Sequence, residues 1–185
     1  MGNTIVIDLS KSKENIWKNM KRKRRSDISR AKKQGIIIER SLNNIEAFVE
    51  MKNKLFEHTN IPISYTSKEL LDKGDNLFIA RDKDGDMVAG ELTITKYNGR
   101  VLKAYKVASK RYLEHKKTIS GLAHSLLVWE IILWAMKAGY RYYDFGGYSS
   151  TGLASGLDVS NINKWKESFG GEIVTKERAK ELYNA

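Results

Sequence analysis

The fold is first recognisable in residues 77–109, which read LFIARDKDGDMVAGELTITKYNGRVLKAYKVAS. Three runs of mostly apolar and β-branched residues are separated by two dipeptides, Asp84-Gly85 and Asn98-Gly99. These dipeptides accept the positive φ angles of tight antiparallel turns. The segment therefore predicts an antiparallel meander, with strands expected at residues 77–80, 88–95 and 101–109.

The first of these turns also looks like the start of a calcium loop, because Asp82, Asp84 and Asp86 alternate with other residues. In a calcium loop the glycine occupies a different place, and an acidic residue completes the twelfth position. Here Gly85 comes too early and the twelfth residue is Thr93. We interpret this segment as a hairpin turn.

Helices and strands alternate on either side of the meander. Residues 121–137 are apolar on nearly every helical face, which predicts a buried helix. Turn residues and apolar periodicity predict the remaining elements. We expect strands at 5–7, 36–38, 142–145 and 173–175, and the apolar run at 36–38 predicts a buried strand. The expected helices are a helical segment at 11–34, a helix starting at Asn43 or Asn44, a short helix at 67–71 capped by Ser67, and a helix that Asp158 or Ser160 caps and that ends at 166–168.

Length and composition limit the classes of protein to consider. The chain has 185 residues, no Cys and only 3 His. We expect residues 1–185 to form a single domain around one core. Disulfides, thiolate metal sites and Cys nucleophiles are excluded, and the widely spaced His argue against zinc. With no recognisable signal peptide and no apolar run near membrane-spanning length, we expect a soluble, cytoplasmic protein.

The positive charge is concentrated in one place. The net charge is +11, and nine basic residues with one acidic residue lie between Lys18 and Lys33. This basic segment has three interpretations. The first is a contact with the phosphates of a nucleic acid such as tRNA, the second is a contact with an anionic membrane surface, and the third is a solvated helix face. The arginines that would make such contacts are Arg22, Arg24, Arg25 and Arg30.

The order of elements resembles that of the GNAT acyltransferase superfamily. The resemblance implies a mixed α/β fold with a central mixed sheet, an antiparallel meander and helices on both faces. In that fold the sheet splits where the last meander strand meets the next, parallel strand, and an acyl donor enters the split. The donor phosphates rest at the start of the buried helix, where free N–H groups and the helix dipole favour anions.

Residues 118–123, TISGLA, match the phosphate signature of that superfamily in part. The signature is Gln/Arg-x-x-Gly-x-Gly/Ala, and Gly121 and Ala123 are in register while Thr118 replaces Gln/Arg. The alternative is an ordinary first helical turn capped by Ser120. The resemblance implies donor contacts from Thr118, Ser120, Gly121, Ala123 and Ser109.

Further motifs resemble the Fem family (FemA, FemB, FemX), aminoacyl-tRNA-dependent peptidyltransferases that build peptidoglycan cross-bridges. Asp144-Phe145-Gly146-Gly147 matches the Tyr-Asp-Phe-Gly-Gly strand of that family. Lys166-x-x-Phe169-Gly170-Gly171 matches its Phe-Lys-x-x-Phe-Gly-Gly helix exit, with Trp165 in place of Phe. Residues 28–35, ISRAKKQG, look like its Ile-Arg-Lys-Ala-x-Lys-x-Gly helix end. The chain resembles the second of the two GNAT-like halves of these enzymes.

The resemblance implies transfer of an acyl or aminoacyl group to an amine. The donor would be an aminoacyl-tRNA or an acyl-CoA, and the acceptor a peptidoglycan precursor or another amine, with no tightly bound cofactor. Lys166 would stabilise charge on the reacting carbonyl, and Asp144 would orient or deprotonate the amine. The substrate cleft would contain Tyr65, Tyr105, Phe145, Gly146 and Gly147.

Each of these residues also has a structural interpretation. Lys166 would simply occupy the negative end of a helix dipole, and Asp144 would close an Asx turn. The second hypothesis for the whole chain is a non-catalytic GNAT-like module that binds RNA or a protein partner through the basic segment. It is favoured by Thr118 in place of Gln/Arg, and by residues 61–65, IPISY, which lack the Arg that family members often place before the Tyr.

Overall fold

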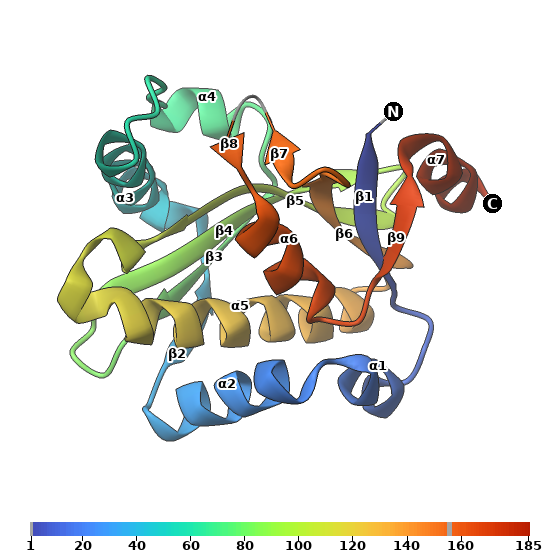
Figure 1. Cartoon of the computed structure of the whole chain (residues 1–185), viewed down its shortest axis with the longest axis horizontal. Coiled ribbons are helices and arrows are strands. Elements are labelled where there is room, and N and C mark those ends of the chain that lie inside the picture. Colours follow the sequence, from blue (N-terminus) through green and yellow to red (C-terminus); the bar gives the residue numbers. More distant parts are fainter. Residues whose placement is uncertain (1, 155–156) are drawn as a thin grey trace. The chain divides into compact units, whose positions relative to one another are not determined.

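The computed structural model describes residues 2–154 and 157–185. Its main sheet has seven strands in the order β2-β3-β4-β5-β6-β1-β9. The sheet is mixed, because β5 and β6 pair in parallel whereas β1 pairs antiparallel with both β6 and β9 (Figure 1). The predicted fold class is confirmed.

The strands of the main sheet are β1 (Asn3–Asp8), β2 (Ile37–Arg40), β3 (Asn76–Arg81), β4 (Met87–Lys96), β5 (Val101–Ser109), β6 (Tyr142–Tyr148) and β9 (Glu172–Thr175). A separate pair consists of β7 (Leu153–Ala154) and β8 (Leu157–Asp158). The α-helices are α1 (Lys13–Asn19), α2 (Arg22–Lys33), α3 (Ile45–His58), α4 (Ser67–Leu71), α5 (Lys117–Lys137), α6 (Ser160–Glu167) and α7 (Lys176–Asn184). Short 3-10 turns occur at Leu42–Asn44, Lys110–Tyr112 and Glu114–Lys116.

Two compact units are formed by interleaved stretches of the chain. Unit 1 contains Met1–Arg25, Thr95–Ala104 and Ile132–Ala185, and unit 2 contains Ser26–Ile94 and Tyr105–Ile131. Each unit draws on segments that are far apart in the sequence. Neither can therefore be cut out of the chain at a single linker.

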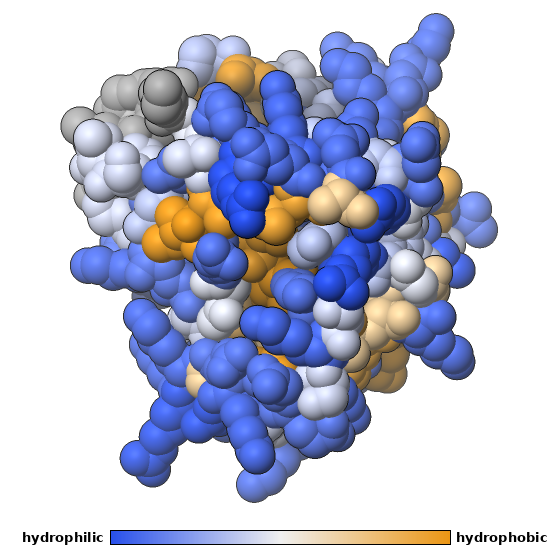
Figure 2. Space-filling view, turned by 90° about the vertical axis from the view of Figure 1, so that its right-hand side faces the viewer, coloured by the Kyte–Doolittle hydropathy of each residue, from blue (hydrophilic) through white to orange (hydrophobic). Residues whose placement is uncertain are grey.

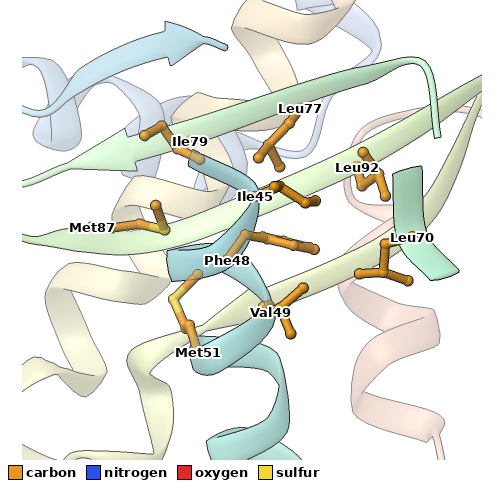
Figure 3. Packing of buried hydrophobic residues seen from close by; sticks show 10 residues of the cluster. Ile45, Phe48, Val49, Met51, Leu70, Leu77, Ile79, Met87 and Leu92 are labelled. Carbon is orange, nitrogen blue, oxygen red and sulfur yellow. The ribbon is translucent and has the colours of Figure 1, made fainter. Parts of the chain in front are cut away.

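The core of unit 2 lies where α3 and α4 pack against β3 and β4 (Figure 3). Phe48 is fully buried over Gly90, where a Cβ atom would stand 2.7 Å from the Phe48 ring. The glycine thus makes room for the ring, and each buried side chain of this kind stabilises the fold by about 1.5–3 kcal/mol. The buried cluster comprises Ile45, Phe48, Val49, Met51, Leu70, Leu77, Ile79, Met87, Leu92 and Ala108.

The meander and its turns are confirmed, with Gly85 and Gly99 both at positive φ. Two other local predictions are wrong. The cap of α4 is Thr66 and not Ser67, because Thr66 forms a reciprocal capping box with Glu69. The strand predicted as buried, β2, ends the sheet order, and Ile37 is 59% exposed there. An edge strand has a neighbouring strand on one side only. The apolar sequence of β2 does not show whether the strand lies at the edge or in the middle of the sheet.

Helix α5 begins at Lys117, one turn before the predicted start. The stretch Glu114–Lys137 is long and apolar enough to cross a membrane, so the expectation that no such run exists is wrong. Its most apolar part is 61% buried in the fold. Core helices pass the same test of length and composition, because burial on all faces also selects apolar residues.

The core of unit 1 lies between α7 and the sheet. Helix α7, which starts at its N-cap Thr175, is not among the elements expected from the sequence. The Tyr183 ring of α7 lies 4.9 Å from the Tyr97 ring and 5.5 Å from the Tyr142 ring, centroid to centroid. The buried members of this cluster are Val6, Val101, Tyr142, Val174, Ala179 and Tyr183.

One edge of unit 1 presents apolar surface. Figure 2 shows an apolar area framed by hydrophilic residues on the side of the molecule where β9 and α7 lie in Figure 1. β9 ends the sheet order, and its Ile173 is exposed. The strand has only 4 residues, and short edge strands are a common protection against pairing with other chains.

The basic segment is not the single helix predicted for residues 11–34. Helix α1 ends at Asn19, Met20 has an extended backbone, and α2 begins at Arg22. Arg25 stabilises this break, because its guanidinium donates hydrogen bonds to the carbonyls of Lys18 (2.9 Å) and Met20 (2.6 Å). These bonds satisfy carbonyl groups at the end of α1 that a continuous helix would have paired internally.

We expect Gly170→Ala to destabilise the fold. Gly170 has a φ of +78°, and a Cβ atom there would stand 2.4 Å from the carbonyl oxygen of Asn19. The conformation alone costs an L-residue about 1–2 kcal/mol, and the backbone clash adds to it, so the free energy of unfolding should fall by more than about 2 kcal/mol in urea denaturation.

Gly121→Ala is the matched control. Gly121 lies inside α5 with open space around its Cβ position, so this change should stabilise the fold by about 0.5–1 kcal/mol. Equal destabilisation by the two variants would contradict this account of Gly170.

Candidate functional site

The parallel strands β5 and β6 separate soon after they meet. They pair at three positions only, from Val101–Tyr142 to Lys103–Asp144. β5 nevertheless continues to Ser109, and β6 continues to Tyr148. The pairing of the two strands therefore ends at Lys103–Asp144, before either strand ends.

A bulge in β6 lies at the same point. Between the pairs Val6–Asp144 and Thr4–Gly147, β1 advances by two residues while β6 advances by three. Gly146 takes up the extra length with a φ of +76°. Bulges are over-represented beside active sites because they redirect the strand and its side chains.

The carboxylate of Asp144 holds this bulge together. Its side chain is 2% exposed, and one oxygen accepts a hydrogen bond of 2.7 Å from the N–H of Gly146, which forms an Asx turn. The Thr4 hydroxyl contacts the same oxygen and also the Gly146 carbonyl. Lys103 lies 3.2 Å from the other oxygen. These partners offset the cost of burying a charge.

Tyr183 of α7 lies near this carboxylate. Burial raises the pKa of the Tyr183 hydroxyl, and the negative charge of Asp144 raises it further. The hydroxyl therefore stays protonated at any physiological pH. Sequence reasoning missed Lys103, Thr4 and Tyr183, because they come from three distant elements and no local pattern links them to Asp144.

The two Fem-like motifs meet beside the bulge. The Lys166 ammonium at the end of α6 donates a hydrogen bond of 2.7 Å to the carbonyl of Gly147. The Tyr148 hydroxyl donates to the Glu167 carboxylate at 2.9 Å, and this bond raises the pKa of Tyr148. Asn163 donates to the carbonyl of Ser149 at 2.6 Å. These three hydrogen bonds hold helix α6 along the end of β6, and Lys166 points at the bulged strand.

The aromatic residues of the two motifs form a packed cluster. Phe145, which sequence reasoning places in the substrate cleft, is buried with its ring centroid 5.3 Å from that of Phe169 and 6.3 Å from that of Trp165. Arg24 covers the cluster, with its guanidinium carbon 5.3 Å from the Trp165 centroid and 5.0 Å from the Phe169 centroid. It also donates to the Ser168 hydroxyl at 2.9 Å.

The four arginines predicted to contact nucleic acid are in different situations. Arg24 is only 6% exposed, and Arg25 binds carbonyls at the end of α1. Arg22 and Arg30 are exposed on α2. The exposed basic residues of α1 and of the start of α2 are Lys13, Lys18, Lys21, Arg22 and Lys23.

Tyr65 and Tyr105 come together in unit 2 around Lys106. Asn53 receives a hydrogen bond from the Tyr65 N–H and donates one to the Tyr65 carbonyl, both at 2.9 Å. The Lys106 ammonium lies 2.7 Å from the Tyr65 hydroxyl oxygen and 4.9 Å from the Tyr105 ring centroid. Both rings pack against the α3 cluster. No sequence signal distinguishes Lys106 from the other lysines of the meander.

A cavity of about 490 Å³ lies at the start of α5, within unit 2. Its lining includes Lys33, Lys83, His115 and Lys116, and also the acidic side chains of Asp82 and Asp84. The predicted donor contacts Thr118, Ser120, Gly121 and Ala123 belong to the first two turns of the helix. Thr118 is exposed, whereas Ser109, Ser120 and Ala123 are buried.

Lys116 connects this cavity to the β3–β4 turn. Its ammonium lies 2.7 Å from Asp82 and 2.9 Å from Asp86. One Asp82 oxygen also accepts hydrogen bonds from the N–H groups of Asp84 and Asp86, which confirms the hairpin turn. Burial tends to raise the pKa of Asp82, but the hydrogen bonds from Lys116 and the turn lower it overall. Lys116 also lowers the pKa of Asp86.

No protein-family model and no curated protein matches the sequence. The chain is similar to the crystal structure of FemX, with a TM-score of 0.75 and 13% identity over 99% of this chain and 64% of that one. It is also similar to the C-terminal domain of a putative lysylphosphatidylglycerol synthetase from Agrobacterium fabrum, with a TM-score of 0.66 and 14% identity over 93% of this chain and 57% of that one.

A third similar structure is a probable N-acyltransferase from Enterococcus faecalis V583, with a TM-score of 0.51 and 11% identity over 94% of this chain and 37% of that one. The chain spans less than two thirds of the length of each of the three structures. Identities this low show the fold alone, and that fold is the Fem/GNAT-like fold predicted from the motifs.

We expect Lys116→Met to change how stability depends on pH. In the wild-type chain the folded pKa of Asp82 lies below its ordinary value of 3.8, so the charged carboxylate stabilises the fold above pH 3.8. That stability is lost as the pH falls through the folded pKa. Without Lys116, Asp82 loses both the hydrogen bond and the charge of that lysine, so its pKa rises. The variant should be less stable than the wild type at neutral pH, and it should lose less stability on acidification.

Urea denaturation between about pH 7 and about pH 2 measures this difference. The control is Lys83→Met, because Lys83 is an exposed neighbour 4.0 Å from Asp84, and such pairs contribute less than about 1 kcal/mol. An unchanged acid slope in Lys116→Met would contradict the role assigned to the pair.

Proposed function

We propose that this chain transfers an acyl or aminoacyl group from an activated donor to an amine. The observation that carries the proposal is the Lys166 ammonium held against the Gly147 carbonyl, directly beyond the bulge where β5 and β6 separate. Such a placement fixes a positive charge beside the strand separation. The three similar structures support the proposal through their shared fold and their names.

The reaction needs only the donor and the acceptor. The amine nitrogen attacks the donor carbonyl carbon, and the tetrahedral intermediate carries the charge on oxygen. The nitrogen–carbon bond forms, the bond to the tRNA ribose oxygen or the coenzyme A sulfur breaks, and the proton that the amine loses is taken up by that leaving oxygen or sulfur. Lys166 would stabilise the oxyanion. The chain has no Cys, so a cysteine acyl-enzyme is not part of the reaction.

Asp144 suits a positioning role better than proton transfer. Its carboxylate is buried, paired with Lys103 and hydrogen-bonded to the Gly146 N–H. These partners leave it poorly placed to reach a substrate amine. We infer that it acts through the bulge, because the bulge fixes the direction of the Gly147 carbonyl that holds Lys166.

We place the donor phosphates at the start of α5. The N-terminal end of a helix favours anions, and Lys33 and Lys83 line the cavity there, beside the carboxylates of Asp82 and Asp84. Aminoacyl-tRNA and acyl-CoA both carry phosphates, and both occur in the cytoplasm, where we propose that the chain acts. Among the predicted donor residues, exposed Thr118 would contact the donor, while buried Ser120, Ala123 and Ser109 would support the helix start.

The resemblance of the motifs to the Fem family supports an aminoacyl-tRNA donor and an amine of a peptidoglycan precursor as acceptor. A second candidate function is RNA binding without catalysis. It is favoured by the exposed basic side chains of α1 and the start of α2, which remain accessible although Arg24 and Arg25 are occupied within unit 1.

We expect Lys166→Ala to lower kcat by about 10²- to 10³-fold, because a preorganised charge at the oxyanion is lost. The melting temperature should change little. Lys164→Ala is the control, since Lys164 is an exposed lysine on the same helix. Transfer is measured by mass spectrometry of an amine acceptor. If transfer by Lys166→Ala equals that of the control, the assignment of Lys166 is wrong.

Donor binding is tested first, by the melting temperature with acetyl-CoA and with aminoacyl-tRNA. A donor that binds the folded chain at about 100 times its Kd should stabilise it by about 2.7 kcal/mol. No shift with either donor would remove the basis of the transferase proposal.

We expect the Arg22→Ala, Lys23→Ala double variant to bind tRNA more weakly while folding normally, because both side chains are exposed. If each neutralises one phosphate, the slope of log K against log salt should become shallower by about 1.4–1.8. Arg24→Ala should instead lower the melting temperature, since Arg24 packs on Trp165 and Phe169. Wild-type binding that is flat with salt would end the RNA interpretation.

A further inference from the structure

Helix α2 buries an arginine against the end of α6. Arg24 is 6% exposed, and its Nε–H donates a hydrogen bond of 2.9 Å to the Ser168 hydroxyl. Ser168 is itself buried, and it donates its hydroxyl hydrogen to the carbonyl of Trp165. The Ser168 hydroxyl therefore joins the Arg24 guanidinium to the last turn of the helix that carries Lys166.

Backbone contacts attach the same part of the chain to the junction between α1 and α2. The N–H of Lys21 donates a hydrogen bond of 2.9 Å to the carbonyl of Ser168. Two residues later, the backbone of Gly170 passes so close to Asn19 that a Cβ atom would collide with the Asn19 carbonyl. All of these residues belong to unit 1. The end of α6 is thus held by backbone contacts and by one buried guanidinium.

The aromatic cluster of the two motifs reaches both ends of the hydrogen bond between Lys166 and Gly147. Trp165 lies directly before Lys166, and its ring centroid is 4.9 Å from that of Phe169. The Phe169 centroid lies 5.3 Å from that of Phe145, which is two residues before Gly147 in the bulged strand. A shift of these rings would therefore move the ammonium donor and the carbonyl acceptor relative to each other.

An arginine suits this position because one group makes both kinds of contact. A planar guanidinium stacks on aromatic rings and donates directed hydrogen bonds at the same time. The guanidinium carbon of Arg24 lies 5.3 Å from the Trp165 centroid and 5.0 Å from the Phe169 centroid. The Nε–H of the same group is bonded to Ser168. A methionine could cover the rings, but it could not donate to the hydroxyl.

We propose that Arg24 is a positioning residue for Lys166 in the proposed transfer reaction. It acts through Ser168 and Trp165, which fix the last turn of α6 and so keep the Lys166 ammonium on the Gly147 carbonyl. A charge stabilises an oxyanion best when it is fixed before the reaction, and a misplacement of about 1 Å can cost about 100-fold in rate. The effect on the rate rests on the proposed function, whereas the control of the Lys166 position does not.

Arg24→Met is the main variant, because it keeps the rings covered and removes the donor to Ser168. At an assay temperature well below its melting temperature, kcat should fall by about 10- to 100-fold, with KM for donor and acceptor unchanged. The control is Leu77→Ala in the core of unit 2, which should also lower the melting temperature but leave kcat unchanged. Equal losses of kcat in the two variants would indicate general destabilisation and would overturn the proposal.

A double-mutant cycle tests whether Arg24 acts through Lys166. In the Lys166→Ala background, Arg24→Met should cause no further fall in kcat, because the group that Arg24 positions is already absent. The residual transfer is followed by mass spectrometry over longer incubations. If Arg24→Met costs the same factor in both backgrounds, the two residues act independently and the proposal is wrong.

The position of Lys166 also has a readout that needs no transfer. Reductive methylation, read by mass spectrometry, should modify wild-type Lys166 more slowly than the exposed Lys164 of the same helix. Arg24→Met should reduce this difference. Ser168→Ala is a smaller change that keeps Arg24 and the rings, and it should act in the same direction. If Lys166 is methylated at the wild-type rate in both variants, the proposal is overturned, whatever their melting temperatures.

The positioning role and the proposed function can fail separately. If the wild-type chain transfers nothing but Arg24→Met speeds the methylation of Lys166, the proposed function fails and the control of Lys166 by Arg24 stands. If transfer occurs and depends on Lys166 but not on Arg24, the positioning role fails and the proposed function stands.

Discussion

The buried carboxylate of Asp144 is the contact on which the arrangement of unit 1 depends. It joins β6 to Thr4 of β1 and to Lys103 of β5, and it ties down the N–H of Gly146 in its own strand. If one partner were removed, the buried charge of Asp144 would be left uncompensated, which is strongly destabilising. The contacts of Asp144 therefore hold the three strands in one register. The bulge follows from that register. The Gly147 carbonyl, one residue beyond the bulge, then fixes where the Lys166 ammonium lies.

The two Gly-Gly pairs of the motifs have different physical causes. Gly146 takes up the length of a bulge at positive φ, while Gly147 has open space at its Cβ position. At Gly170 and Gly171 a Cβ atom would collide with Asn19 and with Ile5. The second pair is therefore a packing requirement between α6, α1 and β1. A motif of this type combines residues that shape a site with residues that only allow neighbouring segments to pack closely. Sequence similarity does not distinguish the two kinds of residue.

Local chemistry explains which parts were predictable from sequence. Asp84-Gly85 and Asn98-Gly99 specify their turns by themselves, and the apolar spacing of residues 45–56 specifies α3, so the meander and this helix are confirmed. The break at Met20 is stabilised by the Arg25 guanidinium, five residues further along the chain, and the exposure of Ile37 depends on its place in the sheet. The partners of Asp144 come from β1 and β5. Such non-local contacts leave no pattern in a single sequence.

Net charge is a poor guide to where electrostatics acts in this chain. The basic segment dominates the count, yet Arg24 and Arg25 are engaged within unit 1, and its exposed lysines are screened by salt within about 10 Å. Single lysines outside that segment have clearer structural roles. Lys103 lies 3.2 Å from the buried carboxylate of Asp144, and Lys116 lies 2.7 Å from Asp82. Composition does not distinguish these two side chains among the 33 lysines and arginines, because their importance comes from the carboxylates that the fold places beside them.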